Sequence, residues 1–199
     1  MKRALGLAVI LGWMWTGGAA RALAQAESKT AGPAASPSDN RQQFLDDLKD
    51  MQEKMVGLAE ATPQEKYTWR PGEGVRSVSE VFLHLARGYF GFPKFWGVQP
   101  PADIALNTLG KSTTDKAKVT EILKRSFEHM RQAVQKISDA DLGKPVDFFG
   151  EKTTVNGLLF IIGTHLHEHL GQAIAYARMN NVVPPWTAER QAKQATTPK

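Results

Sequence analysis

The chain of 199 residues contains no cysteine. This absence excludes disulfide bonds, a lipid-modified cysteine, covalent attachment of a c-type haem and a thiol nucleophile. Any metal site must therefore use nitrogen and oxygen ligands, and stability must come from packing. Since 42% of the residues are hydrophobic, the chain can bury one sizeable core, and we expect a single globular domain.

A large net charge is also lacking once the N-terminus is set aside. The chain begins with a cationic start, an apolar run from Ala4 to Trp15 and small residues that end at Ala24, an order typical of a secretory signal peptide. Cleavage after Ala24 would remove three cations and no acid, and would lower the formal net charge from +5 to +2. The apolar run is shorter than the roughly 20 residues of a spanning helix, so an uncleaved anchor is the secondary interpretation. We expect an exported protein, periplasmic or secreted, with no stable membrane insertion after cleavage.

The mature chain gives no electrostatic reason to bind nucleic acid, because it has no stripe of Lys and Arg interleaved with aromatic residues. It also has no phosphate-binding loop, no pair of sugar-site carboxylates and no nucleotide fingerprint. The expected partner is therefore a small molecule whose class the sequence does not indicate.

No segment shows a convincing alternation of β-type residues, whereas helical periodicity recurs. Apolar residues at three-to-four spacing predict helices over residues 40–61, 77–95, 114–141 and 153–180, with a capping box from Ser77 to Glu80 and a cap at Thr114–Asp115. We therefore predict an all-α fold, a four-helix bundle, over residues 38–186. A signal peptide at 1–24 and a flexible leader at 25–37 would precede the bundle, and a disordered tail at 187–199 would follow it.

Three of the five histidines lie close together, at His165, His167 and His169. An α-helix advances about 100° per residue, so His165 and His169 share a face while His167 points to the opposite side. His84, at the edge of the apolar stripe of the second predicted helix, would point into the bundle and supply a third nitrogen. Three imidazoles with a vacant position suit Zn, Ni, Cu or Fe(II). The sequence thus predicts a metal site of His84, His165 and His169, unless these histidines are only core residues.

Other polar residues near this cluster have two interpretations. Glu80 lies one turn before the first predicted ligand and could support it, but the capping box explains Glu80 equally well. Gln172 could hold a ligand in place or could bridge two helices. We expect His167 at the surface or at an interface, and His129 beside the apolar stripe of the third helix.

Several better-known motifs are excluded by their spacing. A zinc protease would need a histidine where Gly171 follows His167–Glu168, and the chain has no Glu-x-x-His pair of a di-iron bundle. Noncovalent haem would use one histidine and leave two unexplained. A Ser-His-Asp triad has no nucleophile elbow to carry it.

Four motifs between Asn40 and Trp186 resemble those of the DinB-like family of metal-binding four-helix bundles. They are Tyr67-Thr68-Trp69-Arg70-Pro71 with Ser77, Val81-Phe82-Leu83-His84-Leu85-Ala86, His165-x-x-x-His169-x-Gly171-Gln172, and Tyr176-Ala177-Arg178-Met179-Asn180 before Pro184-Pro185-Trp186. The resemblance implies that His84, His165 and His169 bind a divalent transition metal, commonly zinc or nickel. Characterised relatives include thiol-dependent transferases and isomerases, in which the metal activates a thiol as thiolate.

These observations predict an exported metal-dependent enzyme of hydrolase or transferase type, whose open position activates water or a substrate anion. The alternative is a non-catalytic metal-binding or stress-associated protein. A third interpretation, an interaction module without metal, requires that the histidines serve only the core.

Aromatic residues gather where the second predicted helix ends. A homodimer could use them as its interface, or they could pack under the loop from Val98 to Thr114. The residues concerned are Phe90, Phe92, Phe95 and Trp96.

Overall fold

The computed structural model describes residues 37–196, so the predicted signal peptide and the leader up to residue 36 lie outside the described part. The described chain is mostly helical, as the sequence predicts, and no helix in it is long and apolar enough to span a bilayer. Its helices and strands, in chain order, are α2 (Pro37–Ala61), α3 (Val78–Gly91), α4 (Lys116–Gln135), α5 (Asp139–Leu142), β1 (Pro145–Phe148), β2 (Glu151–Thr154), α6 (Val155–Met179) and α7 (Pro185–Thr196).

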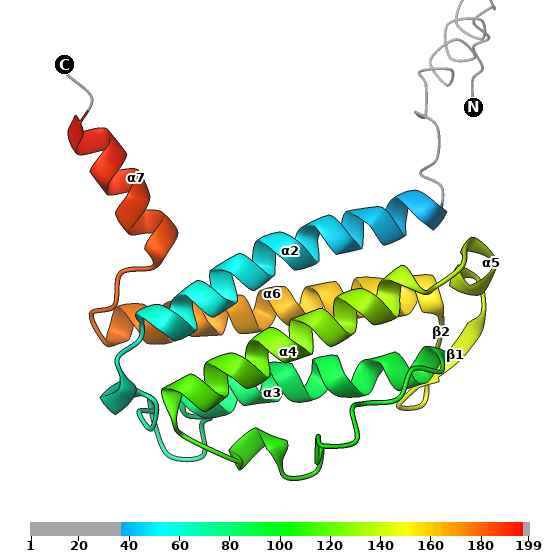
Figure 1. Cartoon of the computed structure of the whole chain (residues 1–199), viewed down its shortest axis with the longest axis horizontal. Coiled ribbons are helices and arrows are strands. Elements are labelled where there is room, and N and C mark those ends of the chain that lie inside the picture. The colour runs from blue at the N-terminus through cyan, green and yellow to red at the C-terminus, as the bar shows by residue number, and fades with distance from the viewer. Residues whose placement is uncertain (1–36, 197–199) are drawn as a thin grey trace, which may run out of the picture. The chain divides into compact units, whose positions relative to one another are not determined.

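The helices α2, α3, α4 and α6 pack around one core (Figure 1). Helix α4 contacts both α2 and α3, and α6 packs closely on α2, whereas α3 and α6 contact each other least of these four pairs. Each helix contributes large apolar side chains that are almost fully buried, including Leu48, Met55, Leu58, Leu85, Phe127, Met130, Leu158 and Ile162. The three histidines lie where α3 and α6 meet, with His84 on α3 and His165 and His169 on α6.

Polar residues set the starts of the helices that carry these contacts. The Ser77 hydroxyl accepts a hydrogen bond from the Glu80 amide, and the Glu80 carboxylate accepts one from the Ser77 amide, which confirms the predicted capping box at the start of α3. Asp115 caps α4 by accepting from the amide of Lys118 at 2.8 Å, also as predicted. The hydroxyl of Thr154 caps α6. These caps set where α3 and α6 begin, whereas their buried apolar residues determine which face each helix turns to the core.

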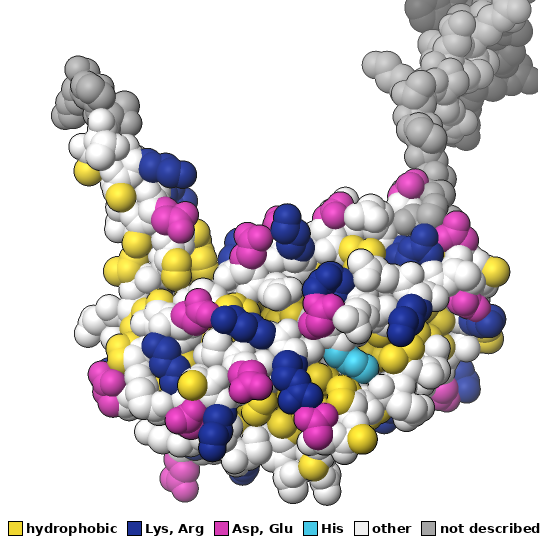
Figure 2. Space-filling model, in the orientation of Figure 1, with side chains coloured by type: hydrophobic (Ala, Val, Ile, Leu, Met, Phe, Trp, Pro, Cys, Tyr) yellow, Lys and Arg dark blue, Asp and Glu magenta, His cyan; other side chains and the backbone are white. Residues whose placement is uncertain are grey.

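The surface formed by α2 and α4 carries acidic and basic side chains in alternation (Figure 2). One ion pair, between Lys124 Nζ and Glu60 Oε1 at 2.6 Å, joins α4 to α2. Neither sign of charge dominates this face.

A β-hairpin corrects the prediction of an all-α fold. Strands β1 and β2 pair antiparallel, with Phe148 opposite Glu151, and the turn between them places Phe149 and Gly150 at φ +55° and +94°. Two successive positive φ angles are the geometry of a two-residue hairpin turn, and the Asp147 carboxylate stabilises it by accepting from the Gly150 amide at 2.7 Å. Four-residue strands are too short to show an alternating pattern, which is why the sequence predicted no strand here.

Helix α7 covers residues 187–196 of the predicted disordered tail, and it begins before the predicted domain end at Trp186, while residues 197–199 lie outside the described part. None of its residues is fully buried, although Trp186 packs partly on the core. Proline in the first helical position and a run of Ala, Gln, Glu, Lys and Arg favour helix without any apolar stripe. The helix was not predicted because helices were identified by an apolar stripe, which this segment lacks.

The aromatic residues at the end of α3 pack within the chain. Phe92 and Phe95 contact Phe148 of the hairpin, with ring centroids 5.7 and 5.1 Å apart, and the Trp96 indole donates to the carbonyl of Ala133. Their contacts are thus with the hairpin and α4 rather than only with the loop after Val98, and the homodimer stays a prediction.

Candidate metal centre

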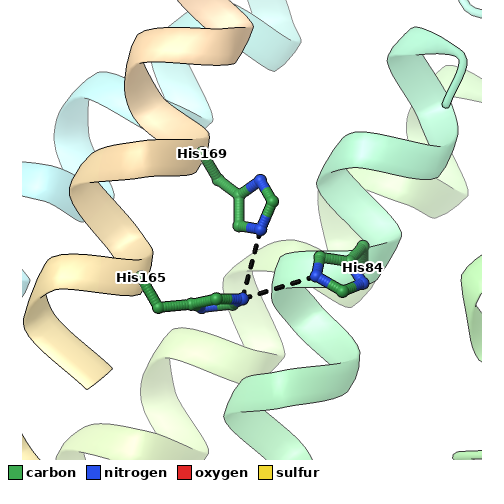
Figure 3. A group of neighbouring side chains, drawn as sticks. All are labelled: His84, His165 and His169. Carbon is green, nitrogen blue, oxygen red and sulfur yellow. Dashed lines mark hydrogen bonds between the residues drawn. The ribbon is translucent and has the colours of Figure 1, made fainter. Parts of the chain in front are cut away.

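The structure brings the three predicted ligands together, with His84 on α3 facing His165 and His169 on α6 (Figure 3). Nε2 of His165 lies 3.1 Å from Nε2 of His169 and 3.4 Å from Nε2 of His84. The i,i+4 spacing places the two α6 histidines on one face, as the sequence predicts. All three candidate ligand atoms lie within 4.8 Å of one another.

These distances fit a metal ion. With metal–nitrogen bonds of about 2.0–2.1 Å, ligand atoms at the corners of a tetrahedron are about 3.3 Å apart. The separations of 3.1 and 3.4 Å lie on either side of that value. Three ring nitrogens that face one point also repel through their lone pairs unless a proton or a cation lies between them. The cluster can therefore hold a metal ion.

A chain of hydrogen bonds determines which nitrogen of His169 carries its proton. The backbone carbonyl of Arg76 can only accept, so the Tyr176 hydroxyl donates to it at 3.1 Å. The Tyr176 oxygen then accepts from the amide nitrogen of Gln172 at 3.1 Å, which leaves the Gln172 carbonyl oxygen to accept from His169 Nδ1 at 3.0 Å. His169 therefore carries its proton on Nδ1, and the lone pair of Nε2 points at the cluster. Gln172 thus orients a candidate ligand, and its role in a metal centre stays a prediction.

His165 is held by packing instead. Its buried Nδ1 has no hydrogen-bond partner among the described residues. Its ring lies edge to face with Phe92, at a centroid distance of 5.6 Å. Gly88 makes this contact possible, since a Cβ there would lie 2.9 Å from the Phe92 ring. A small residue on α3 is thus a condition for the position of the His165 ring.

Burial keeps two of the rings neutral. It lowers the pKa of His84 to about 4, and the positive charge of Arg76 acts in the same direction. Burial likewise lowers the pKa of His165 to about 4, with smaller contributions from His169 and Arg76. At neutral pH both rings are therefore uncharged and can offer a lone pair to a metal.

The other polar candidates lie outside the cluster. The Glu80 carboxylate is occupied by the Ser77 amide and by Arg70, whose Nη2 lies 3.3 Å away, so the capping role is the one the structure shows. His167 points away from the cluster and bonds Asp47 of α2 at 3.0 Å. His129 is partly buried on α4 beside Phe90, and its Nε2 has no partner among the described residues.

Tyr176 and Arg76 are the site residues that sequence reasoning missed. Tyr176 lies four residues after Gln172 on the same helical face, so the spacing could have linked the two. Arg76 acts through its backbone carbonyl, and no feature of the sequence marks that role.

A family model described as the DinB superfamily matches residues 47–173 of the chain. The fold is similar to the crystal structure of a DinB-like protein from Bacillus cereus ATCC 10987, with a TM-score of 0.64 and 17% identity over 72% of this chain and 95% of that one. A DinB-like protein from Bacillus subtilis gives a TM-score of 0.57 and 20% identity over 71% of this chain and 93% of its own. No curated protein matches the chain.

Proposed function

Because this chain belongs to the DinB superfamily and brings three histidine nitrogens to one point, we propose that it is a metalloprotein with a divalent transition metal held by His84, His165 and His169. We further propose a metal-dependent reaction of hydrolase or transferase type at the remaining coordination position. The observation that carries the proposal is the convergence of the three Nε2 atoms, with His169 held in the tautomer that a ligand needs.

The donor set supports zinc or nickel as the metal. Three imidazoles and no carboxylate or thiolate form a site of intermediate softness, which suits Zn, Ni, Cu and Fe(II) better than Mg or Ca. The two short nitrogen separations match a tetrahedral arrangement, the one that zinc adopts most often. We therefore propose zinc or nickel as the bound metal.

The metal, when bound, would supply a Lewis acid that lowers the pKa of water or of a substrate group. The protein residues have separate tasks. His84 also lines a cavity of about 920 Å³, so a small molecule can approach the cluster from that side. Gln172 keeps the His169 lone pair directed at the cluster, and burial keeps His84 and His165 unprotonated at neutral pH.

Export is a further part of the proposal. The charged start, the short apolar run and the small residues before Ala24 support a signal peptide, and the absence of cysteine leaves no thiol to oxidise outside the cytoplasm. The mature protein would then meet its metal and its substrate in the periplasm or the medium.

Metal analysis of the mature protein tests this proposal, with His84→Ala and His169→Ala as site variants. His167→Ala is the matched control, because His167 lies on the same helix but bonds Asp47. We expect about one zinc or nickel per chain in the wild type and in His167→Ala, and loss of the metal in both site variants. A chelator should lower the melting temperature of the wild type. Wild-type protein without near-stoichiometric metal, and a melting temperature that the chelator leaves unchanged, would refute the proposal.

The enzymatic part has its own measurement. Cobalt-substituted protein should change its visible spectrum when a small anion replaces an exchangeable water. A spectrum that no added ligand changes would mean that the position is closed, and it would favour the non-catalytic metal-binding role.

A further inference from the structure

The cavity that shares His84 with the metal cluster has an unusual charge. Its walls come from the segment before α3, from α3 itself and from the loop that leads to α4. Its ionisable residues besides His84 are four cations and one acid, namely Arg70, Arg76, Arg87, Lys111 and Glu80.

One of these cations is already neutralised. Arg70 forms an ion pair with Glu80 at 3.3 Å and also donates to the carbonyl of Val75 at 2.8 Å. In contrast, no carboxylate within residues 37–196 lies within 4.0 Å of Arg76, Arg87 or Lys111. The charge of Lys111 also acts on Glu80, but four cations and one acid still leave the cavity a formal charge of about +3.

This arrangement differs from that of the face formed by α2 and α4. There, cations and acids alternate and pair, as Lys124 does with Glu60 at 2.6 Å (Figure 2). Around the cavity, three cations face a shared space without acidic partners. Like charges around one concave surface repel, and a bound anion would relieve that repulsion.

The charged side chains also lie close to the cluster. The charge of Arg76 acts on both His84 and His165, and that of Arg87 acts on His84. Arg87 follows His84 by three residues on α3, so the two are neighbours on the helix surface. An anionic group bound by these arginines would therefore lie beside the metal position rather than on a remote surface.

We propose that this cavity binds an anionic oxygen group of the substrate, a carboxylate or a phosphate, with Arg76, Arg87 and Lys111 as its counter-ions. The hydroxyls of Thr108 and Ser112 line the same cavity and can add hydrogen bonds. A volume of about 920 Å³ suits a small metabolite rather than a polymer. This inference rests on the proposed function, since it assigns the substrate class of the same site.

The test measures binding of two probes, inorganic phosphate and succinate, by calorimetry on the metal-free and the zinc-loaded protein. Arg76→Gln, Arg87→Gln and Lys111→Gln should each weaken binding by about 3- to 10-fold, because each removes one charge-assisted contact at a partly solvated site. Lys49→Gln is the matched control, since Lys49 is an exposed cation of α2 that lines a different groove. Binding should also weaken as sodium chloride is added. The relative affinity of the two probes distinguishes phosphate from carboxylate.

Binding of neither probe, or binding that the three substitutions leave unchanged, would overturn the inference. All variants change exposed side chains, and circular dichroism checks that they fold. Zinc content is measured on the same samples, so the two proposals fail separately. Zinc without anion binding overturns the anion site alone, whereas anion binding to a chain that takes up no zinc supports the cavity assignment and refutes the metal proposal.

Discussion

The hydrogen-bond chain behind His169 leads to a quantitative prediction about Gln172 and Tyr176. Gln172→Ala removes the oxygen that accepts from His169 Nδ1, so the ring can rotate and its proton can move to Nε2. Loss of such a supporting contact typically weakens metal binding 10- to 100-fold, or about 1.4 to 2.7 kcal/mol.

Tyr176→Phe should have a smaller effect. The ring stays in place, because it packs edge to face on Trp69 at 5.4 Å, but both hydrogen bonds of the hydroxyl are lost. The Gln172 amide can then turn either way, and one of its two orientations still accepts from His169. We expect zinc affinity to fall about 2- to 5-fold, because the supporting contact is weakened rather than removed.

The assay is competition for zinc against a chromogenic chelator near neutral pH, with the wild type, both single variants and the double variant. The two effects should not add, since the Tyr176 hydroxyl acts on the metal only through Gln172. Tyr176→Phe should therefore change nothing in the Gln172→Ala background. An equal loss in both backgrounds, or a Gln172→Ala protein with wild-type affinity, would refute the reasoning about the tautomer.

The remaining predictions concern stability and the residues outside the cluster. Tyr67→Phe should destabilise the protein by about 1 kcal/mol in urea unfolding, because the buried hydroxyl donates to the Ala59 carbonyl at 2.7 Å. Tyr89→Phe should be neutral or stabilising, because the buried hydroxyl of Tyr89 has no partner among the described residues. Burial raises the pKa of Tyr67 from 10.0 to about 12, so its stabilising contribution is complete below pH 10 and is lost as the pH rises toward 12. The free energy of unfolding of the wild type should therefore fall across this pH range. The fall should be smaller for Tyr67→Phe. Ser77→Ala should lower the free energy of unfolding in urea by about 1 kcal/mol, because the capping box is lost. Asp47→Asn should leave the zinc content unchanged, because its partner His167 lies away from the cluster.

The helices and the three central histidines could be predicted because they depend on local rules. A period of 3.6 residues places His165 and His169 on one face whatever the rest of the chain does, and the Ser77 capping box sets the start of α3 by contacts within four residues. The position of His84 opposite them followed from the same period and from the general need of an amphipathic helix to bury its stripe.

The remaining features depend on contacts between distant segments. The carbonyl that anchors the Tyr176 hydroxyl belongs to Arg76, 100 residues away, and no local pattern connects the two. The cavity wall at Lys111 is likewise placed by the path of a loop. The hairpin was not predicted because its strands have only four residues each, and because its turn uses Phe149–Gly150 rather than the usual Asn-Gly.

The histidine cluster between α3 and α6 has a consequence for a protein without cysteine. These neighbouring helices contact each other least, and a metal ion shared by His84 and His165 would tie together positions 81 residues apart. Because the unfolded chain releases the ion, the link stabilises the folded protein by mass action, by about 4 kcal/mol when free metal exceeds the Kd about 1,000-fold. The ion would thus serve as a removable cross-link between the two helices, whose strength is set by metal supply rather than by redox state.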